Sequence, residues 1–264
     1  MPDYHAAMPG GNPLHEAADR SSPAHRDLRL RLLAAIEADR LARTPLRPCP
    51  YLPLLQAREQ AFLADSLDPE LYHDLMDRGF RRSGEMFYAA DCPGCRRCVP
   101  IRVPVAEFAP SRSQRRVLRK NADVQVAVRA PTFTRATWDL YRSYVRHQHP
   151  TRPTDETEDD FRGSLYARVV DTREVVYSLG GQVVAISLVD VCGRSVSAVY
   201  HFYDPAFAAR SLGVFSVLAE IEWARQAGVP HYYLGYWVEG SRTMHYKANY
   251  RPHELLRDGV WRRA

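Results

Sequence analysis

The stretch EVVYSLGGQVVAISLVDVCGRSVSAVYHFYD, residues 174–204, contains the clearest secondary-structure pattern in this sequence. It contains three runs rich in valine, isoleucine and aromatic residues, which are separated by Gly180-Gly181 and by Gly193. Short β-prone runs divided by glycine turns are typical of an antiparallel meander. These residues therefore predict three consecutive antiparallel strands.

The residues after the meander predict a turn, a helix and one more strand. The turn contains RSLG at 210–213, the helix is expected over 214–226, and the strand begins at Tyr232. This order is similar to the acetyltransferase (GNAT) fold, in which a turn of the form R-x-x-G-x-G or R-x-x-G-x-A binds the pyrophosphate of coenzyme A at a helix N-terminus. Here Phe215 occupies the last position, where we expect its ring to block the approach of a pyrophosphate. The resemblance implies a GNAT-like scaffold with another activated acyl donor.

Length and composition are those of an ordinary folded protein. The 264 residues, 45% apolar and 25% charged, suffice for one large or two small domains. We predict an α+β fold of mostly antiparallel, mixed sheets flanked by helices. It is divided into a flexible tail (1–24), an N-terminal Cys-containing basic domain (25–129) and a C-terminal GNAT-like transferase domain (130–264). The strand expected at 98–108 holds Pro100, which predicts an edge strand or a bulge.

The sequence shows neither a membrane span nor a secretory signal. No run approaches the ~18 uninterrupted apolar residues of a transmembrane helix, and residues 1–24 lack the apolar core of a signal peptide. We therefore expect a cytoplasmic protein without a membrane partner.

The positive charge is concentrated in one segment. The formal net charge is +5, but residues 81–120 alone carry +7 and the rest of the chain carries −2. A local basic block favours a polyanion or an acidic ligand as partner, and the alternative is a solvated, salt-bridged face.

Four of the five cysteines lie within the first 98 residues. Cys92, Cys95 and Cys98 form a C-x-x-C-x-x-C motif, and Cys49 precedes them. Two-residue gaps let thiolates face one centre, and a distant fourth cysteine can complete a tetrahedral set, so the motif predicts a zinc or iron–sulfur site. The alternative is a tight turn of reduced, metal-free thiols. Arg96 and Arg97 lie inside the motif and are expected to lower the pKa of these thiols, which would make them reactive.

Motifs along the whole chain resemble those of the aminoacyl-tRNA–protein transferases. In the N-terminal half they are CPYLP at 49–53, GFRRSG at 79–84, the C-x-x-C-x-x-C turn, and SRSQRR at 111–116. In the C-terminal half they are FYDP at 202–205, RSLG at 210–213, LGYW at 234–237, and M-x-YKA-x-YRP at 244–252. The resemblance covers about residues 40–256.

The resemblance implies an enzyme of two GNAT-like halves that uses no coenzyme A and requires no cofactor for its chemistry. Members of the family move the aminoacyl group of a charged tRNA to the N-terminal amine of proteins that begin with Asp or Glu, which marks them for N-end rule degradation. The cysteine pattern is similar to the bacterial branch, which implies leucine from Leu-tRNA as donor. Arginyl-tRNA is the alternative donor. A coenzyme A-dependent N-acetyltransferase is a more distant alternative. Another is a non-enzymatic, metal-dependent tRNA-binding or redox-sensing module built on the cysteines.

One departure from the family concerns the cysteines. Eukaryotic members carry two cysteine pairs that have been linked to an iron–sulfur cluster. Here Leu52 stands where one of those cysteines is expected, and Arg96 follows Cys95. Cluster binding therefore does not transfer directly to this chain.

The implied reaction is aminolysis of an ester, which needs positioning, a proton acceptor and a hydrogen-bond donor to the oxyanion. Asp204 is the candidate proton acceptor, and its alternative role is a turn-forming aspartate before Pro205. Tyr203 and Tyr236 are candidates to donate to the ester oxygen or to stack on the terminal adenine. Their alternative role is in the core.

Cationic side chains are the candidate contacts to both anionic substrates. The acceptor carboxylate is expected to bind one or more arginines around the cysteine turn, namely Arg81, Arg82, Arg96 and Arg97. The tRNA phosphates are expected to bind Arg112, Arg115, Arg116, Arg119, Lys120 and Lys247. For each of them the alternative is a solvated charge.

Overall fold

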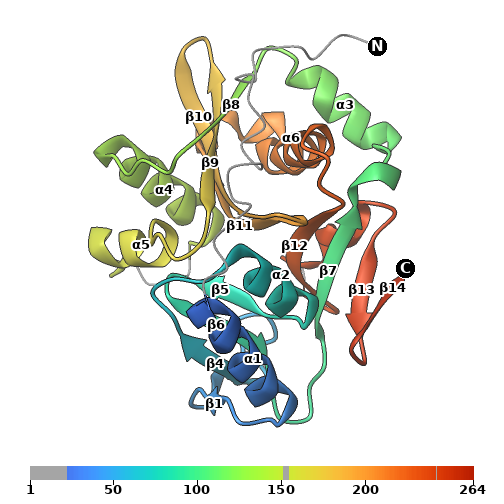
Figure 1. The fold of residues 1–264 in the computed structure, drawn as a ribbon. Helices are drawn as coiled ribbons and strands as arrows, with labels where there is room; N and C mark the ends of the chain where they lie inside the picture. Colours follow the sequence, from blue (N-terminus) through green and yellow to red (C-terminus); the bar gives the residue numbers. More distant parts are fainter. Residues whose placement is uncertain (1–22, 151–154, 242) are drawn as a thin grey trace.

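The computed structural model describes residues 23–150, 155–241 and 243–264. The tail predicted for residues 1–24 lies almost entirely outside this range. The strands form one eight-stranded sheet, one four-stranded sheet and one two-stranded ribbon, and helices flank them (Figure 1). The predicted α+β class with mostly antiparallel, mixed sheets is confirmed.

The large sheet has the strand order β14-β13-β7-β12-β11-β10-β9-β8. Its strands are β7 (Cys98–Pro104), β8 (Gln125–Arg129), β9 (Thr172–Leu179), β10 (Gln182–Cys192), β11 (Ser195–Tyr203), β12 (His231–Val238), β13 (Glu254–Arg257) and β14 (Val260–Arg263). All neighbours are antiparallel except β11 and β12, which are parallel. The meander predicted from residues 174–204 is therefore β9-β10-β11.

Helices cover both faces of the large sheet (Figure 1). They are α3 (Arg112–Lys120), α4 (Arg135–Gln148), α5 (Glu158–Leu165) and α6 (Leu212–Gln226). Ile186 and Leu188 of β10 pack in one apolar cluster with residues of α4 and α5, whereas Val189 packs in another with residues of α6. A bulge between Leu188 and Val189 disturbs the pairing at this point. Alternation along the strand thus places Leu188 and Val189 in the cores on opposite faces of the sheet.

A smaller unit holds the N-terminal elements (Figure 1). Its sheet has the order β1-β4-β6-β5, and β2 and β3 form the ribbon. The elements are α1 (Pro23–Glu37), β1 (Ala42–Arg43), β2 (Arg47–Pro48), β3 (Gln56–Ala57), β4 (Glu59–Leu63), α2 (Pro69–Asp77), β5 (Arg81–Ser83) and β6 (Met86–Ala90). Short 3-10 helices complete the chain at η2 (Val105–Glu107), η3 (Pro205–Arg210) and η4 (His245–Asn249).

Capping residues in the sequence determine where α2 and α3 begin and where α2 ends. The Asp68 carboxylate accepts hydrogen bonds from the first N–H groups of α2, and Gly79 follows that helix with φ +88°. Ser111 and Gln114 form a capping box at the start of α3. The strongly basic helix is therefore fixed at its N-terminus by its own sequence.

The strand β7 differs from its prediction in two ways. It lies inside the large sheet between β13 and β12, so it is no edge strand. The sheet tolerates Pro100 because β13 pairs only with Ile101 and Arg102. Because β7 and β8 both come from the predicted N-terminal domain but belong to the large sheet, the boundary at residue 129 does not separate two sheets.

Candidate functional site

The parallel strands β11 and β12, at the centre of the large sheet, pair with each other over only a short distance. The ladder between β11 and β12 joins only Ser195–Ser197 to His231–Tyr233. Beyond it, β11 continues to Tyr203 and β12 continues to Val238 without pairing with each other, while β12 stays paired with β7 along its other edge. We call the point just after Ser197 and Tyr233 the strand fork.

Arg81 reaches the strand fork from the smaller unit. Its Nη1 donates to Ser197 Oγ at 2.7 Å, and its Nη2 donates to the Ala198 carbonyl. Arg81 is only 9% exposed. These two bonds fix the guanidinium where β11 leaves β12.

Lys247 of η4 approaches the same place from the other strand. A Cβ added to Gly235 of β12 would lie 3.3 Å from Lys247 Nζ and 3.6 Å from Arg81 Nε. Gly235 has φ +89°, so its left-handed backbone and this close approach both favour glycine. Both cations therefore lie against one glycine.

The Lys247 ammonium is held in an unfavourable environment. The residue is 7% exposed, and burial lowers its pKa to about 7, with a further lowering by the charge of Arg81. The nearby Cys98 acts weakly in the opposite direction. Within the described residues, neither Arg81 nor Lys247 forms an ion pair with a carboxylate.

Arg82 has a different role from its neighbour. Its guanidinium donates to both carboxylate oxygens of Asp190, at 2.7 and 2.6 Å, and to Thr172 Oγ1 at 2.8 Å. The side chains of Arg82 and Asp190 are fully buried. Arg82 therefore holds β5 to β10, and the prediction that it binds the acceptor is not supported.

Tyr236 is likewise committed to the core. Its hydroxyl donates to the Gly79 carbonyl at 2.7 Å, and burial raises the pKa of this phenol well above its usual value. The hydroxyl proton is thus unavailable to an ester oxygen. The structure favours the core alternative over the predicted catalytic role.

Asp204 and Tyr203 lie at the far end of β11. The Asp204 carboxylate accepts a hydrogen bond from the Ala206 N–H at 2.9 Å and caps η3, as expected for a turn-forming aspartate before proline. The Tyr203 hydroxyl is 3.5 Å from Gln148 Oε1, and its ring meets Tyr144 edge to face. Both residues are partly exposed and accessible to a substrate.

Phe215, whose ring was expected to block the turn before α6, lies in the core instead. The Phe215 ring is 2% exposed and packs on Tyr177 beneath the helix, so it does not fill the turn. Arg210 forms a two-bond ion pair with Asp123, at 2.7 and 3.0 Å. This pair ties the turn to the segment that follows α3.

The basic helix α3 exposes most of its charges. Arg115 donates to the Pro110 carbonyl at 2.5 Å, and Lys120 donates to the Ala209 carbonyl in η3. Arg112, Arg116 and Arg119 are exposed and have no hydrogen-bond or ion-pair partner among the described residues. The C-terminal end of α3 therefore contacts the turn before α6, with free guanidinium groups along the helix.

The +7 block of residues 81–120 is not one surface. Arg82 is in the core, and Arg102 pairs with Asp77 and Glu254 at 2.7 Å each. Exposed Arg96 and Arg97 remain on the cysteine turn. The cationic residues that lie close together in sequence thus occupy at least three different places in the fold.

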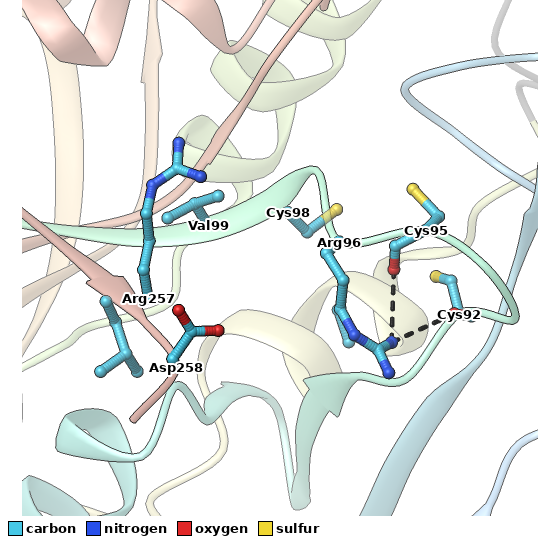
Figure 2. A pocket seen from close by; sticks show the side chains of 9 residues that line it. Cys92, Cys95, Arg96, Cys98, Val99, Arg257 and Asp258 are labelled. Atoms are coloured by element: carbon cyan, nitrogen blue, oxygen red, sulfur yellow. Dashed lines mark hydrogen bonds between the residues drawn. The ribbon is translucent and has the colours of Figure 1, made fainter. Parts of the chain in front are cut away.

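The cysteine turn lines a pocket of about 250 Å³. Figure 2 shows Cys92, Cys95 and Cys98 on one side and the β13–β14 turn, with Arg257 and Asp258, on the other. All five cysteines are free thiols.

For Cys98, the predicted lowering of the thiol pKa by Arg96 and Arg97 is wrong. Its Nη1 donates to the carbonyls of Cys92 and Cys95 at 3.4 Å each (Figure 2). Burial instead raises the pKa of the Cys98 thiol to about 12, and the neighbouring thiols of Cys92 and Cys49 raise it further.

The arrangement of the four thiols does not fit a metal site. They are near enough to influence the charge of Cys98, yet among residues 23–150, 155–241 and 243–264 no three His, Cys, Asp or Glu side chains gather closely enough to hold a metal ion. The described residues therefore do not support the predicted zinc or iron–sulfur site.

Sequence reasoning missed that Lys247 lies beside Arg81. It assigned Lys247 to tRNA, but the side chain is buried at the strand fork rather than displayed on the surface. One signal was present: Lys120 and Lys247 are the only lysines in a chain rich in arginine.

Comparison with known proteins agrees with this reading of the chain. Residues 47–116 match the family model "Arginine-tRNA-protein transferase, N terminus", and residues 136–257 match "Arginine-tRNA-protein transferase, C terminus". The chain is 39% identical to the aspartate/glutamate leucyltransferase of Marinobacter nauticus, over 83% of this chain and 93% of that protein. Identity to the same-named protein of Pseudomonas aeruginosa is also 39%, over 83% and 94%.

Solved structures resemble the chain more distantly. The C-terminal domain of a putative lysylphosphatidylglycerol synthetase from Agrobacterium fabrum has a TM-score of 0.47 at 16% identity, covering 77% of this chain and 65% of that one. A GCN5-related N-acetyltransferase from Kribbella flavida has a TM-score of 0.36 at 14% identity, covering 89% and 76%.

Among the described residues, no helix is both long and apolar enough to cross a membrane. The two family models together match most of the chain, in the order N terminus then C terminus, and the relatives at 39% identity are covered almost completely. The chain therefore belongs to the arginine-tRNA-protein transferase family.

Proposed function

We propose that the protein transfers leucine from Leu-tRNA to the N-terminal amine of proteins that begin with Asp or Glu. The observation that carries this proposal is the 39% identity to aspartate/glutamate leucyltransferases over 83% of the chain. Arginine is the alternative donor, since the family models are named for arginine-tRNA. The product would be directed to N-end rule degradation, and charged tRNA as substrate agrees with the predicted cytoplasmic location.

The proposed reaction is one acyl transfer. The neutral α-amine of the acceptor attacks the ester carbonyl carbon, so a C–N bond forms and the bond to the ribose oxygen breaks. The amine loses a proton, and the leaving ribose oxygen gains one. Because the ester is already activated, the protein contributes mainly positioning and charge stabilisation.

The free guanidinium groups of α3 support a role in tRNA binding. Arg112, Arg116 and Arg119 lie along an exposed helix and have no partner among the described residues, which suits a row of backbone phosphates. Since α3 ends against the turn before α6, a tRNA bound along it would bring its 3′ end toward β11.

Asp204 remains the predicted proton acceptor, and Tyr203 remains a candidate to stack on the terminal adenine. An α-amine has a pKa of about 8, so only mild base assistance is required. One Asp204 oxygen is used in the η3 cap, and the other forms no hydrogen bond within the described part of the chain.

The test is a transfer assay with purified protein, Leu-tRNA and short peptides that differ only in their first residue. We expect leucine on peptides that begin with Asp or Glu and none on the matched Ala peptide. Absence of transfer from any charged tRNA would contradict the proposal. Calorimetric binding of acetyl-CoA would instead favour an N-acetyltransferase.

A further inference from the structure

We infer that Arg81 and Lys247 together form the site that binds the side-chain carboxylate of the acceptor's first residue. This inference rests on the proposed function and deepens it. It assigns acceptor specificity to two residues from distant parts of the chain, and it moves Lys247 from the tRNA to the acceptor.

Arg81 and Lys247 carry charges that no neighbouring carboxylate compensates among the described residues. Two cationic side chains, 9% and 7% exposed, lie against the same glycine without a carboxylate partner among the described residues. Buried charges in proteins are normally paired, because removing them from water is costly and like charges repel. A bound carboxylate would relieve both costs.

Arg81 and Lys247 each hold a hydrogen-bond donor that a carboxylate could use. The terminal nitrogens of Arg81 are held by Ser197 and Ala198, which fixes the guanidinium and leaves its Nε without a partner among the described residues. Lys247 Nζ also has no acceptor there. Both atoms approach Gly235 closely, since a Cβ there would lie 3.3 Å from Lys247 Nζ and 3.6 Å from Arg81 Nε. Two rigidly placed donors suit the two oxygens of one carboxylate.

The two cations also give the site selectivity for an acid over its amide. The amide of Asn or Gln has nearly the shape of the acid but no charge, so it would leave both cations uncompensated. A site with two buried cations therefore favours Asp and Glu over their amides by the cost of burying unpaired charge. The same site disfavours an apolar first residue for the same reason.

The location of Arg81 and Lys247 also affects the role that Asp204 can have. The α-amine of an aspartate lies on the order of 5 Å from its own carboxylate. Asp204 is six residues beyond Ala198, which is about 20 Å along an extended strand. An acceptor bound at the strand fork therefore presents its amine far from Asp204, which favours the turn-forming role for that residue.

The experiment compares wild type with Lys247→Met and Arg81→Gln in the full-length protein. Transfer kinetics are measured on peptides that begin with Asp, Glu or Asn, and peptide binding is measured by calorimetry without tRNA. Arg262→Gln, at an exposed arginine of β14, is the matched control. Melting curves establish that each variant is folded, and Lys247→Arg retains the positive charge.

We expect either charge removal to raise the KM for the Asp peptide by on the order of 10²-fold and to reduce the preference for Asp over Asn, with the KM for charged tRNA unchanged. Lys247→Arg should keep the preference for the acid.

The inference would be overturned if acceptor preference were unchanged in both variants, or if only the KM for tRNA rose. Transfer by wild type would still support the proposed function in that case. If wild type transfers nothing but binds the Asp peptide through Lys247, the proposed transfer activity is refuted and the carboxylate site is supported. If it neither transfers nor prefers the Asp peptide to the Asn peptide, both fail.

Discussion

Arg82 and Asp190 form a fully buried ion pair that joins β5 of the smaller unit to β10 of the large sheet. Arg81, the preceding residue, reaches the strand fork from the same short strand. The Arg82–Asp190 pair therefore fixes the position of β5, from which Arg81 extends. Its contribution can be measured as a change in the free energy of unfolding.

We expect Arg82→Met to lower the free energy of unfolding by about 3–5 kcal/mol, because it leaves the Asp190 carboxylate buried without a partner. The double variant Arg82→Met/Asp190→Leu should recover most of that loss, since no charge then remains. Urea unfolding measures both, with Arg262→Met as the exposed control. A loss below about 1 kcal/mol in the single variant would show that the pair is not required.

Lys247 should titrate near neutral pH. Its pKa is lowered to about 7 by burial and by Arg81, whereas an exposed lysine titrates near 10.4. Because the chain has two lysines, NMR of ¹³Cε-labelled lysine gives two signals, and Lys120→Arg identifies them. Addition of an Asp peptide should raise the pKa of Lys247, since a carboxylate favours the ammonium form. Two signals that both titrate near 10 would contradict the buried environment.

Acceptor affinity should fall as the pH rises above about 7. The groups that face Lys247 are Arg81 from β5 and Cys98 from β7, and the Cys98 thiol stays protonated in this range. Above its pKa the free Lys247 is neutral, so binding a carboxylate then requires proton uptake, which lowers the affinity by up to tenfold per pH unit. Calorimetry between pH 6.5 and 8.5 measures this. The slope should be lost in Lys247→Arg, and an equal slope in both proteins would refute the assignment.

The exposed arginines of α3 should control tRNA affinity and its salt dependence. We expect Arg116→Gln/Arg119→Gln to weaken binding and to reduce the slope of log K against log salt by about one per lost contact, because fewer counterions are released. Arg168→Gln/Arg262→Gln, at exposed positions elsewhere, is the control. Filter binding at several salt concentrations provides the data. Identical slopes for both double variants would place the tRNA on another surface.

Replacement of Asp204 separates its two possible roles. Asparagine caps a helix about as well as aspartate, so Asp204→Asn preserves the η3 cap but removes a base. If the acceptor binds at the strand fork, this variant should transfer leucine within a few-fold of wild type, whereas Asp204→Ala should lose about 1 kcal/mol of stability. A loss near 10²-fold in the rate for Asp204→Asn would make Asp204 the proton acceptor and would contradict the acceptor site.

The predictable parts of this fold are those encoded over a few residues. The glycines between the β-prone runs of 174–204 specify the meander, and Ser111 with Gln114 specifies the start of α3. In both cases the partners lie close in sequence, so pattern and propensity suffice.

The parts that sequence reasoning missed depend on distant pairings. Pro100 indicates an edge strand locally, yet β7 is inserted between two strands that begin more than 120 residues later. Arg81 and Arg82 are identical neighbours in sequence, but alternation along β5 sends one to Ser197 and the other to Asp190. Lys247 acquires its role only because η4 folds back onto β12.

The most direct measurement is mass spectrometry of an Asp peptide after incubation with the protein and equal amounts of Leu-tRNA and Arg-tRNA, beside the matched Asn peptide. We expect leucine to be added to the N-terminal amine of the Asp peptide and the Asn peptide to be left unchanged. Addition of arginine, equal modification of both peptides, or no modification of either would contradict it.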